Sequence, residues 1–170
     1  LRSLPGLSAN DIDDSVAAAQ KLLNNSTTPL GYNQRIDQAD SLTAIDSARN
    51  DGIAALNNLL LSAKAKGERN NSLDDAIKQI RQEQTNANSR IDQTSNLTDE
   101  QKKAYHDQIS KVVNDSIDTL NKVDSSKIAE TVTNAKSSIE NIVSDARGTA
   151  DKEIEEARTK AAQDIDTAVN

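Results

Sequence analysis

The chain has one histidine, His106, which is the first candidate for a general base or metal ligand because imidazole titrates near neutral pH. Asp107 follows it directly, and Ile109 falls on the apolar face of the helix expected here. Neighbouring residues on a helix point in different directions, so this carboxylate is not expected to face the imidazole. We interpret His106 as an exposed or boundary side chain on a helix.

Two acidic clusters are candidates for binding a cation. Asp11, Asp13 and Asp14 lie close together, but a calcium loop also needs a sharp glycine turn and a distal bidentate glutamate. The residues after Asp14 continue a helical pattern instead, so we assign this cluster to the start of a helix. The glutamates of residues 153–156 alternate with basic residues, as on a solvated helix face. Neither cluster is predicted to bind metal.

Other kinds of catalysis lack the residues that they need. Cysteine is absent, which excludes thiol nucleophiles, disulfides and thiolate metal sites. No glycine-rich phosphate loop is present, and the lone histidine does not converge with a nucleophile and an acid. The sequence therefore predicts a protein that is not an enzyme and that holds no cofactor.

Leu30 and Tyr32 are the candidate contact residues for a partner. Tyr32 is expected in a loop beside Gly31, and exposed tyrosine is favoured at recognition sites. Its ring has a second interpretation, which is to cap the end of a helical bundle by packing over the loop. The leucines of residues 59–61 form the other apolar patch that a partner could cover.

Composition limits the class of the protein. The net charge is −7, so the phosphate backbone of a nucleic acid would be repelled. No apolar run approaches the roughly 20 residues of a membrane span. Phe, Trp and Met are absent, so the core has to come from Ile, Leu, Val and Ala. Such residues suit thin layers of helix on helix.

Apolar residues recur with helical spacing along most of the chain, which predicts an all-α fold. The five expected stripes begin at Ile12, Ile45, Leu73, Tyr105 and Ile128. Proline and glycine predict a loop over residues 24–31, and a break is expected at residues 67–71. Residues 98–101 fit a capping box, and weaker helix starts are expected at Ser72 and Asp124.

The most informative feature is an internal repeat. Residues 33–43 and 88–98 agree at seven of eleven positions, and the Ile91-Asp92 pair recurs 74 residues later at residues 165–166. This period predicts a short helix at about 98–122, a turn, and a long helix at about 124–168. A helix of that length spans about 65 Å and cannot bury its apolar stripe within one small domain.

We therefore expect tandem three-helix bundles of the spectrin type, which share long connecting helices and form an elongated rod. The expected domains are an N-terminal helical region with a partial, divergent repeat (1–70), a complete bundle (71–147) and the first helix of the following repeat (148–170). The long helices are expected to cross between bundles near Gly148 and at residues 67–71.

The motif of residues 96–102, with Ile-Asp pairs at 91–92 and 117–118, resembles a known family. It is similar to the alanine-rich helical repeats, a domain of unknown function, in Gram-positive cell-surface adhesins such as giant staphylococcal matrix-binding proteins and lactobacillal surface proteins. The resemblance covers residues 79–170 and, more loosely, 33–66; residues 1–32 match nothing. Fewer alanines and the residues around Gly67 depart from the family pattern. The resemblance implies secretion, anchoring to the cell wall and a spacer or adhesion role.

The sequence and this resemblance together predict a stalk segment of a cell-wall adhesin, which is extracellular, monomeric in solution and holds a distal binding region away from the bacterium. The alternative is that the region itself binds a host extracellular protein, a glycan or a sister molecule. A cytosolic coiled-coil protein is a third interpretation, which the heptad breaks at Gly52, Gly67 and Gly148 disfavour.

Overall fold

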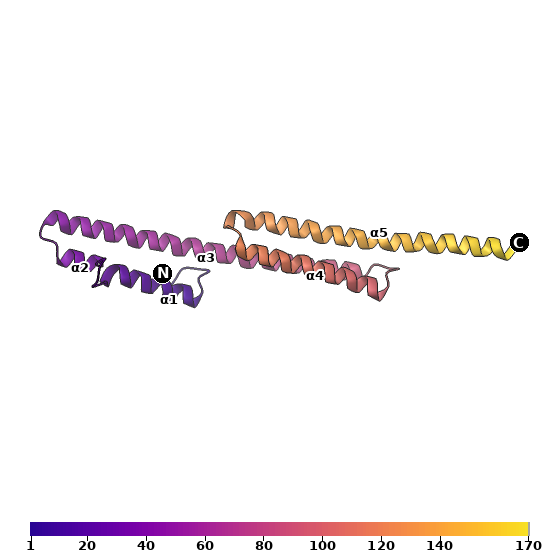
Figure 1. The fold of residues 1–170 in the computed structure, drawn as a ribbon, viewed down its shortest axis with the longest axis horizontal. Helices are drawn as coiled ribbons and strands as arrows, with labels where there is room; N and C mark the ends of the chain where they lie inside the picture. Colours follow the sequence, from indigo (N-terminus) through magenta and orange to yellow (C-terminus); the bar gives the residue numbers. More distant parts are fainter. Residues whose placement is uncertain (170) are drawn as a thin grey trace. The chain divides into compact units, whose positions relative to one another are not determined.

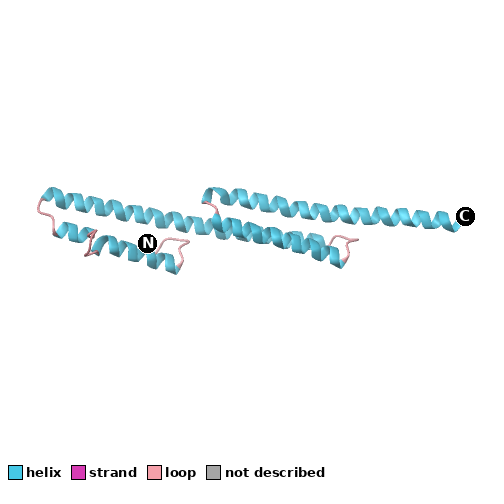
Figure 2. Cartoon of the chain, in the orientation of Figure 1, coloured by secondary structure: helices cyan, strands magenta, loops and turns pink. Residues whose placement is uncertain are grey.

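The computed structural model describes residues 1–169, and in this part of the chain every regular element is a helix (Figure 2). The elements are α1 (Ala9–Asn24), α2 (Tyr32–Asp37), α3 (Leu42–Asp92), α4 (Asp99–Lys122), the short 3-10 helix η1 (Ser125–Lys127) and α5 (Ile128–Val169). The predicted all-α fold is confirmed. The chain forms two compact units, which we call unit 1 (Leu1–Ser72) and unit 2 (Leu73–Asn170).

The predicted loop before α2 and the helices on both sides of the turn at residues 123–127 are confirmed. Thr98 forms the expected capping box, since its hydroxyl accepts from the Gln101 N–H at 3.1 Å and the Gln101 side chain accepts from the Thr98 N–H at 2.8 Å. Such reciprocal bonds satisfy two N–H groups that have no partner within the helix.

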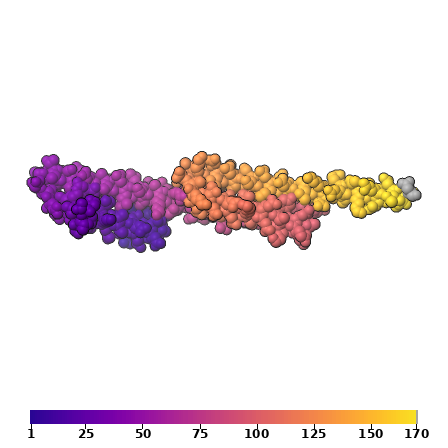
Figure 3. Space-filling model, viewed as in Figure 1, coloured from indigo at the N-terminus to yellow at the C-terminus, as the bar shows by residue number. Residues whose placement is uncertain are grey.

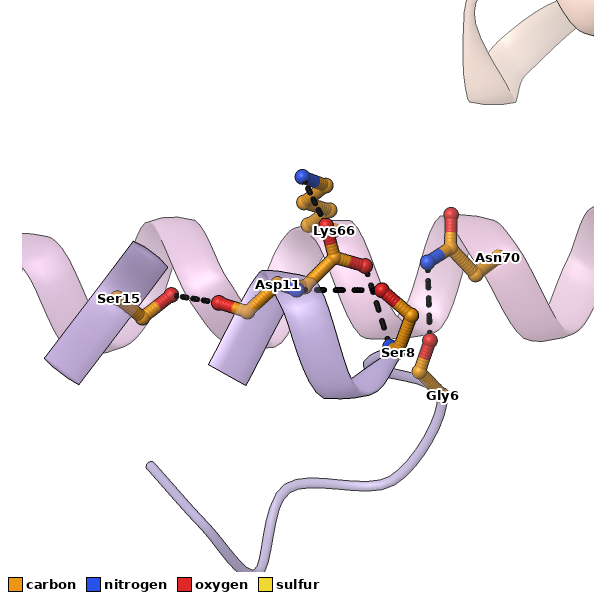
Figure 4. A network of polar contacts seen from close by, with 6 residues as sticks. All are labelled: Gly6, Ser8, Asp11, Ser15, Lys66 and Asn70. Carbon is orange, nitrogen blue, oxygen red and sulfur yellow. Dashed lines mark hydrogen bonds and ion pairs between the residues drawn. The ribbon is translucent and has the colours of Figure 1, made fainter. Parts of the chain in front are cut away.

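The predicted break at residues 67–71 and the helix start at Ser72 are wrong, because α3 continues through both. Gly67 is buried instead, and a Cβ there would overlap the carbonyl oxygen of Pro5. The Asn70 side chain donates to the carbonyl oxygen of Gly6 at 2.9 Å (Figure 4). Glycine in this helix therefore marks a close approach of two backbones and not the end of the helix.

In unit 1, α1 and α2 lie along the first part of α3 (Figure 1). In this part of α3 the side chains that become buried are small, namely Ala48 and Ala63, with Gly52 beside them. Larger apolar residues of the same helix stay open to solvent, with Ile53 at 53% and Leu60 at 42% exposure. Unit 1 is therefore a thin layer of helices with little core.

Unit 2 has a continuous core built from three helical segments: the end of α3, α4 and the first part of α5. Its largest fully buried side chains are Ile80, Ile91, Ile109, Val113, Leu120, Ile139 and Val143. The predicted stripe on α5 included Ile142, but Val143 is the buried residue and Ile142 is half-buried. Arg90 and Glu140 form a bidentate ion pair at 2.6 and 2.8 Å at the edge of this core.

The last part of α5, from Glu155 onward, has no cover within unit 2. The helix passes through Gly148 without a break, as predicted, and a Cβ at this glycine would meet nothing within 4 Å. Every side chain from Glu155 to Val169 is exposed, and Figure 3 shows this part of α5 in yellow. Among the described residues, no helix combines the length and apolar character needed to cross a membrane.

Candidate functional site

The loop between α1 and α2 is held by its own side chains. The Asn25 amide nitrogen donates to the carbonyl oxygen of Pro29 at 2.6 Å, and the Gly31 N–H donates to the carbonyl oxygen of Asn25 at 2.7 Å. Any side chain at Gly31 would collide with the backbone of Leu23 and Asn25, so only glycine fits. The loop is therefore a defined structure that presents Leu30 and Tyr32 from a fixed backbone.

The sequence predicted Tyr32 in a loop, and this prediction is wrong: Tyr32 is the first residue of α2. Its ring is half-buried and packs against α3, where a Cβ at Gly52 would lie 3.0 Å from the tyrosine Cγ. The Arg35 guanidinium lies over the ring, 4.8 Å from its centroid. Arg35 also forms an ion pair with Asp51 at 2.8 Å, which fixes the cation over the ring.

Leu30 and Tyr32 come together at a hollow of about 670 Å³ within unit 1. The hollow is lined by Ala18, Lys21, Leu22, Asn25, Pro29, Leu30, Gly31, Tyr32 and Arg35. Lys21 has no ion-pair partner among the described residues, while the Arg35 charge is shared with Asp51. The hollow thus combines an apolar floor with one unpaired cation at its edge.

Arg35 and Lys21 also line the hollow, and neither was predicted from the sequence as a site residue. Arg35 follows Tyr32 by one helical turn, a spacing that brings an arginine next to an aromatic ring on a helix, so this residue could have been found. Lys21 reaches the hollow only because the loop folds back on α1, and no local pattern indicates this. A contact of Leu30 or Tyr32 with a partner stays a prediction.

The other candidates for chemistry do not line this hollow. His106 is half-buried on α4, and its Nε2 lies 3.1 Å from a carboxylate oxygen of Asp92 without hydrogen-bond geometry. Asp11 belongs to the first turn of α1, as predicted, where it completes a capping box with Ser8. In the described part of the chain, no group of three or more acidic, histidine or cysteine side chains is placed to hold a metal ion.

Comparison of the chain with protein-family models, with curated proteins and with solved structures found no match. The family resemblance noted in the sequence therefore remains a proposal. In its described residues the chain is an all-helical bundle of long helices.

Proposed function

We propose that this protein is a non-enzymatic spacer segment of a bacterial cell-surface adhesin, in which tandem three-helix bundles share long helices and form a rod. The observation that carries the proposal is α3, a single helix of 51 residues that contributes side chains to both compact units. A helix shared in this way transmits bending and tension from one bundle to the next. The expected family and the extracellular location belong to the same proposal.

Several features of the described residues support this role. The charged side chains of α5 form pairs one turn apart, such as Arg158 with Glu155 at 2.7 Å. Such pairs favour a helix that is exposed on most of its surface. The net charge of −7 keeps neighbouring molecules apart and limits collapse onto an anionic cell wall.

The experiment is a distance measurement along α3. The chain has no cysteine, so two cysteines introduced at the exposed positions Ser47 and Ser89 carry spin labels at unique sites. A straight helix places them about 65 Å apart, with a narrow distribution. Gly67→Pro in the same doubly labelled protein is the control, because a proline inside a helix kinks it and should broaden or shorten the distance.

A short or broad distance in the parent protein would contradict a spacer role, because a hinge inside α3 cannot hold two bundles apart. The location is tested separately. A secretion signal and a cell-wall sorting signal in the gene would support it, and a gene that encodes neither would contradict the extracellular part of the proposal.

The hollow beside Tyr32 favours the alternative, in which unit 1 itself contacts a host protein or glycan. Beads coated with this protein would be tested on surfaces of extracellular-matrix protein and of glycan. Attachment that Tyr32→Ser and Leu30→Ser abolish, and that Leu42→Ser leaves unchanged, would establish the binding module. Leu42 is the control because it is an apolar residue of unit 1, 82% exposed, that does not line the hollow.

A further inference from the structure

Helix α1 of unit 1 and helix α4 of unit 2 begin in the same way. Each follows a turn with one residue at positive φ, which is Gly6 at 78° before α1 and Asn96 at 66° before α4. Each helix is then started by a capping box two residues later, built on Ser8 in unit 1 and on Thr98 in unit 2. The two N-caps therefore align α1 with α4 residue by residue.

Both helices border a concave surface at the same place. Leu22 and Asn25 line the hollow of unit 1, and the residues aligned with them, Val112 and Asp115, line a groove of about 360 Å³ in unit 2. This groove is open although three helical segments form the core of unit 2. The hollow beside α1 is therefore not explained as the place of an absent helix.

The hollow and the groove differ in the chemistry of their linings. Hydroxyl, amide and carboxylate side chains make up most of the lining in unit 2. In unit 1 the lining is mainly apolar and includes Ala18, Leu22, Pro29, Leu30 and Tyr32. The one amide side chain there belongs to Asn25, and its nitrogen already donates to the carbonyl oxygens of Thr27 and Pro29. The hollow therefore offers an apolar surface and few polar groups.

The lysine beside each concave surface is in a different state of charge compensation. Lys111 of unit 2 forms an ion pair at 2.6 Å with Asp115, one turn further along α4. In unit 1 the aligned lysine is Lys21, and the residue one turn further is the uncharged Asn25. Lys21 consequently has no ion-pair partner within the described chain, and no acidic residue of this part lines the hollow. The uncompensated charge at the hollow is positive.

We propose that the hollow of unit 1 binds a small amphipathic acid, which is a molecule with an alkyl chain and one carboxylate. The alkyl chain lies against Leu22, Leu30 and Tyr32, and the carboxylate pairs with Lys21 at the edge. A hollow of about 670 Å³ falls within the range of roughly 300–1,000 Å³ in which proteins hold small ligands. Burial of the alkyl chain supplies affinity, and the ion pair supplies the preference for an acid.

Two other classes of small ligand fit the hollow less well. A neutral sugar needs several hydrogen-bonding side chains, and the amide of Asn25 is engaged within the loop. The Tyr32 ring, on which a sugar would stack, is overlain by the Arg35 guanidinium at 4.8 Å from its centroid. A cation would be repelled by Lys21. Since the net charge of the chain is −7, a bound anion reports the local lysine and not a general attraction.

The test is an NMR titration of the full chain with octanoate, followed through the methyl signals of Leu22 and Leu30. These signals should shift and saturate, with a dissociation constant of about 1 mM or lower. Lys21→Gln should weaken octanoate binding about threefold or more, as expected for an ion pair near the surface. The same variant should leave the binding of 1-octanol unchanged, because octanol has the alkyl chain without the charge.

Matched variants separate the hollow from the rest of the surface. Lys111→Gln is the control for Lys21→Gln, because Lys111 occupies the aligned position on α4 and does not line the hollow. Ala18→Phe puts a large side chain into the hollow and should abolish the binding of both ligands. Ala17→Phe is its control, since Ala17 is exposed and does not line the hollow. Circular dichroism of each variant would show that the helices remain folded.

Three results would overturn the proposal, and none of them depends on whether the protein is a spacer. The first is the absence of a saturable shift at octanoate concentrations up to about 10 mM. The second is an equal effect of Lys21→Gln and Lys111→Gln on octanoate, which would mean that Lys21 does not pair with the carboxylate. The third is octanoate binding to a folded Ala18→Phe protein as strong as to the parent, which would place the ligand outside the hollow.

Discussion

Units 1 and 2 share a plan of turn, cap and long helix, but they fill it with different cores. Unit 2 encloses seven branched aliphatic side chains that are essentially without solvent contact, at positions contributed by three helical segments. In unit 1 the fully buried side chains of α3 are alanines, and its leucines and isoleucines are half-buried or exposed. The comparison indicates that caps and turns determine where the helices begin and end. Whether the large aliphatic side chains are buried depends on the presence of a third helical segment, as in unit 2.

The two caps show the same plan with different charges. In unit 1 the carboxylate of Asp11 completes the cap of α1 and forms an ion pair with Lys66 on α3 (Figure 4). In unit 2 the amide of Gln101 completes the cap of α4 and donates to Glu153 on α5 at 3.0 Å. Asp11 and Gln101 are the third residues of α1 and α4, and each links its helix to a long helix, α3 or α5. Only the link in unit 1 is an ion pair.

The largest expected effect comes from removing a core side chain of unit 2. Ile109→Ala should lower the free energy of unfolding of unit 2 by about 2–5 kcal/mol, because Ile109 is fully buried and leaves a cavity. Leu59→Ala in unit 1 should cost only about 1 kcal/mol, because Leu59 is half-buried.

Urea unfolding followed by tyrosine fluorescence measures each unit separately, since the chain has one tyrosine in each. Tyr105→Phe leaves the signal of unit 1, and Tyr32→Phe leaves that of unit 2. Leu42→Ala, at an 82% exposed position, is the control and should have almost no effect. If Ile109→Ala and Leu59→Ala lowered the free energy of unfolding equally, the proposed difference between the cores of the two units would be wrong.

The next prediction is that replacing glycine by alanine changes the stability in opposite directions at Gly67 and at Gly148. Gly67→Ala should destabilise unit 1 by about 1–3 kcal/mol, because the added Cβ overlaps the Pro5 carbonyl and the segment that crosses α3 must move. Gly148→Ala should stabilise α5 by up to about 1 kcal/mol, because this Cβ meets no neighbour and alanine favours a helix. Thermal unfolding by circular dichroism measures both. A stabilising Gly67→Ala would mean that the Pro5 segment does not pack on α3 in solution.

The smallest effect concerns the charge in the cap of unit 1. The hydrogen bond from the Lys66 side chain, with those from Ser8, lowers the pKa of Asp11 to about 2. A carboxyl whose folded-state pKa lies below the ordinary 3.8 adds stability above that pH and loses it as the pH falls through about 2. Lys66→Gln should therefore raise the pKa of Asp11 and weaken this acid dependence.

Titration of the Asp11 carboxyl by NMR measures the pKa directly. Lys64→Gln is the matched control, because Lys64 pairs with Glu68 on the same helix and does not contact the cap. An unchanged pKa of Asp11 in Lys66→Gln would show that the lysine does not hold the carboxylate in solution.

Local signals made most of the fold predictable. The apolar spacing that begins at Ile128 predicted α5, and the capping box at Thr98 predicted the first turn of α4, because both depend on residues close together in the chain. The same reasoning failed at Gly67, where glycine was interpreted as a break. The residue that requires glycine there is Pro5, far away in the sequence, and no local pattern contains that information.

The residues of the candidate site were also predictable only where the signal was local. Leu30 and Tyr32 were predicted from the loop signals and from the preference for exposed tyrosine at recognition sites, and both line the hollow of unit 1. Lys21 was missed because the loop has to fold back before this lysine reaches the hollow.

By itself the sequence determined the all-α fold class, the limits of α4 and the course of α5, and the recurrence of the Ile-Asp motif, because hydrogen bonds and side-chain spacing within a helix are local. Only the tertiary structure decided which stripes become a core. Ile91 and Ile165 lie in the same motif, yet one is fully buried and the other is 65% exposed. Burial requires neighbouring helices, and a pattern along one helix specifies a face to be covered without supplying the segments that cover it.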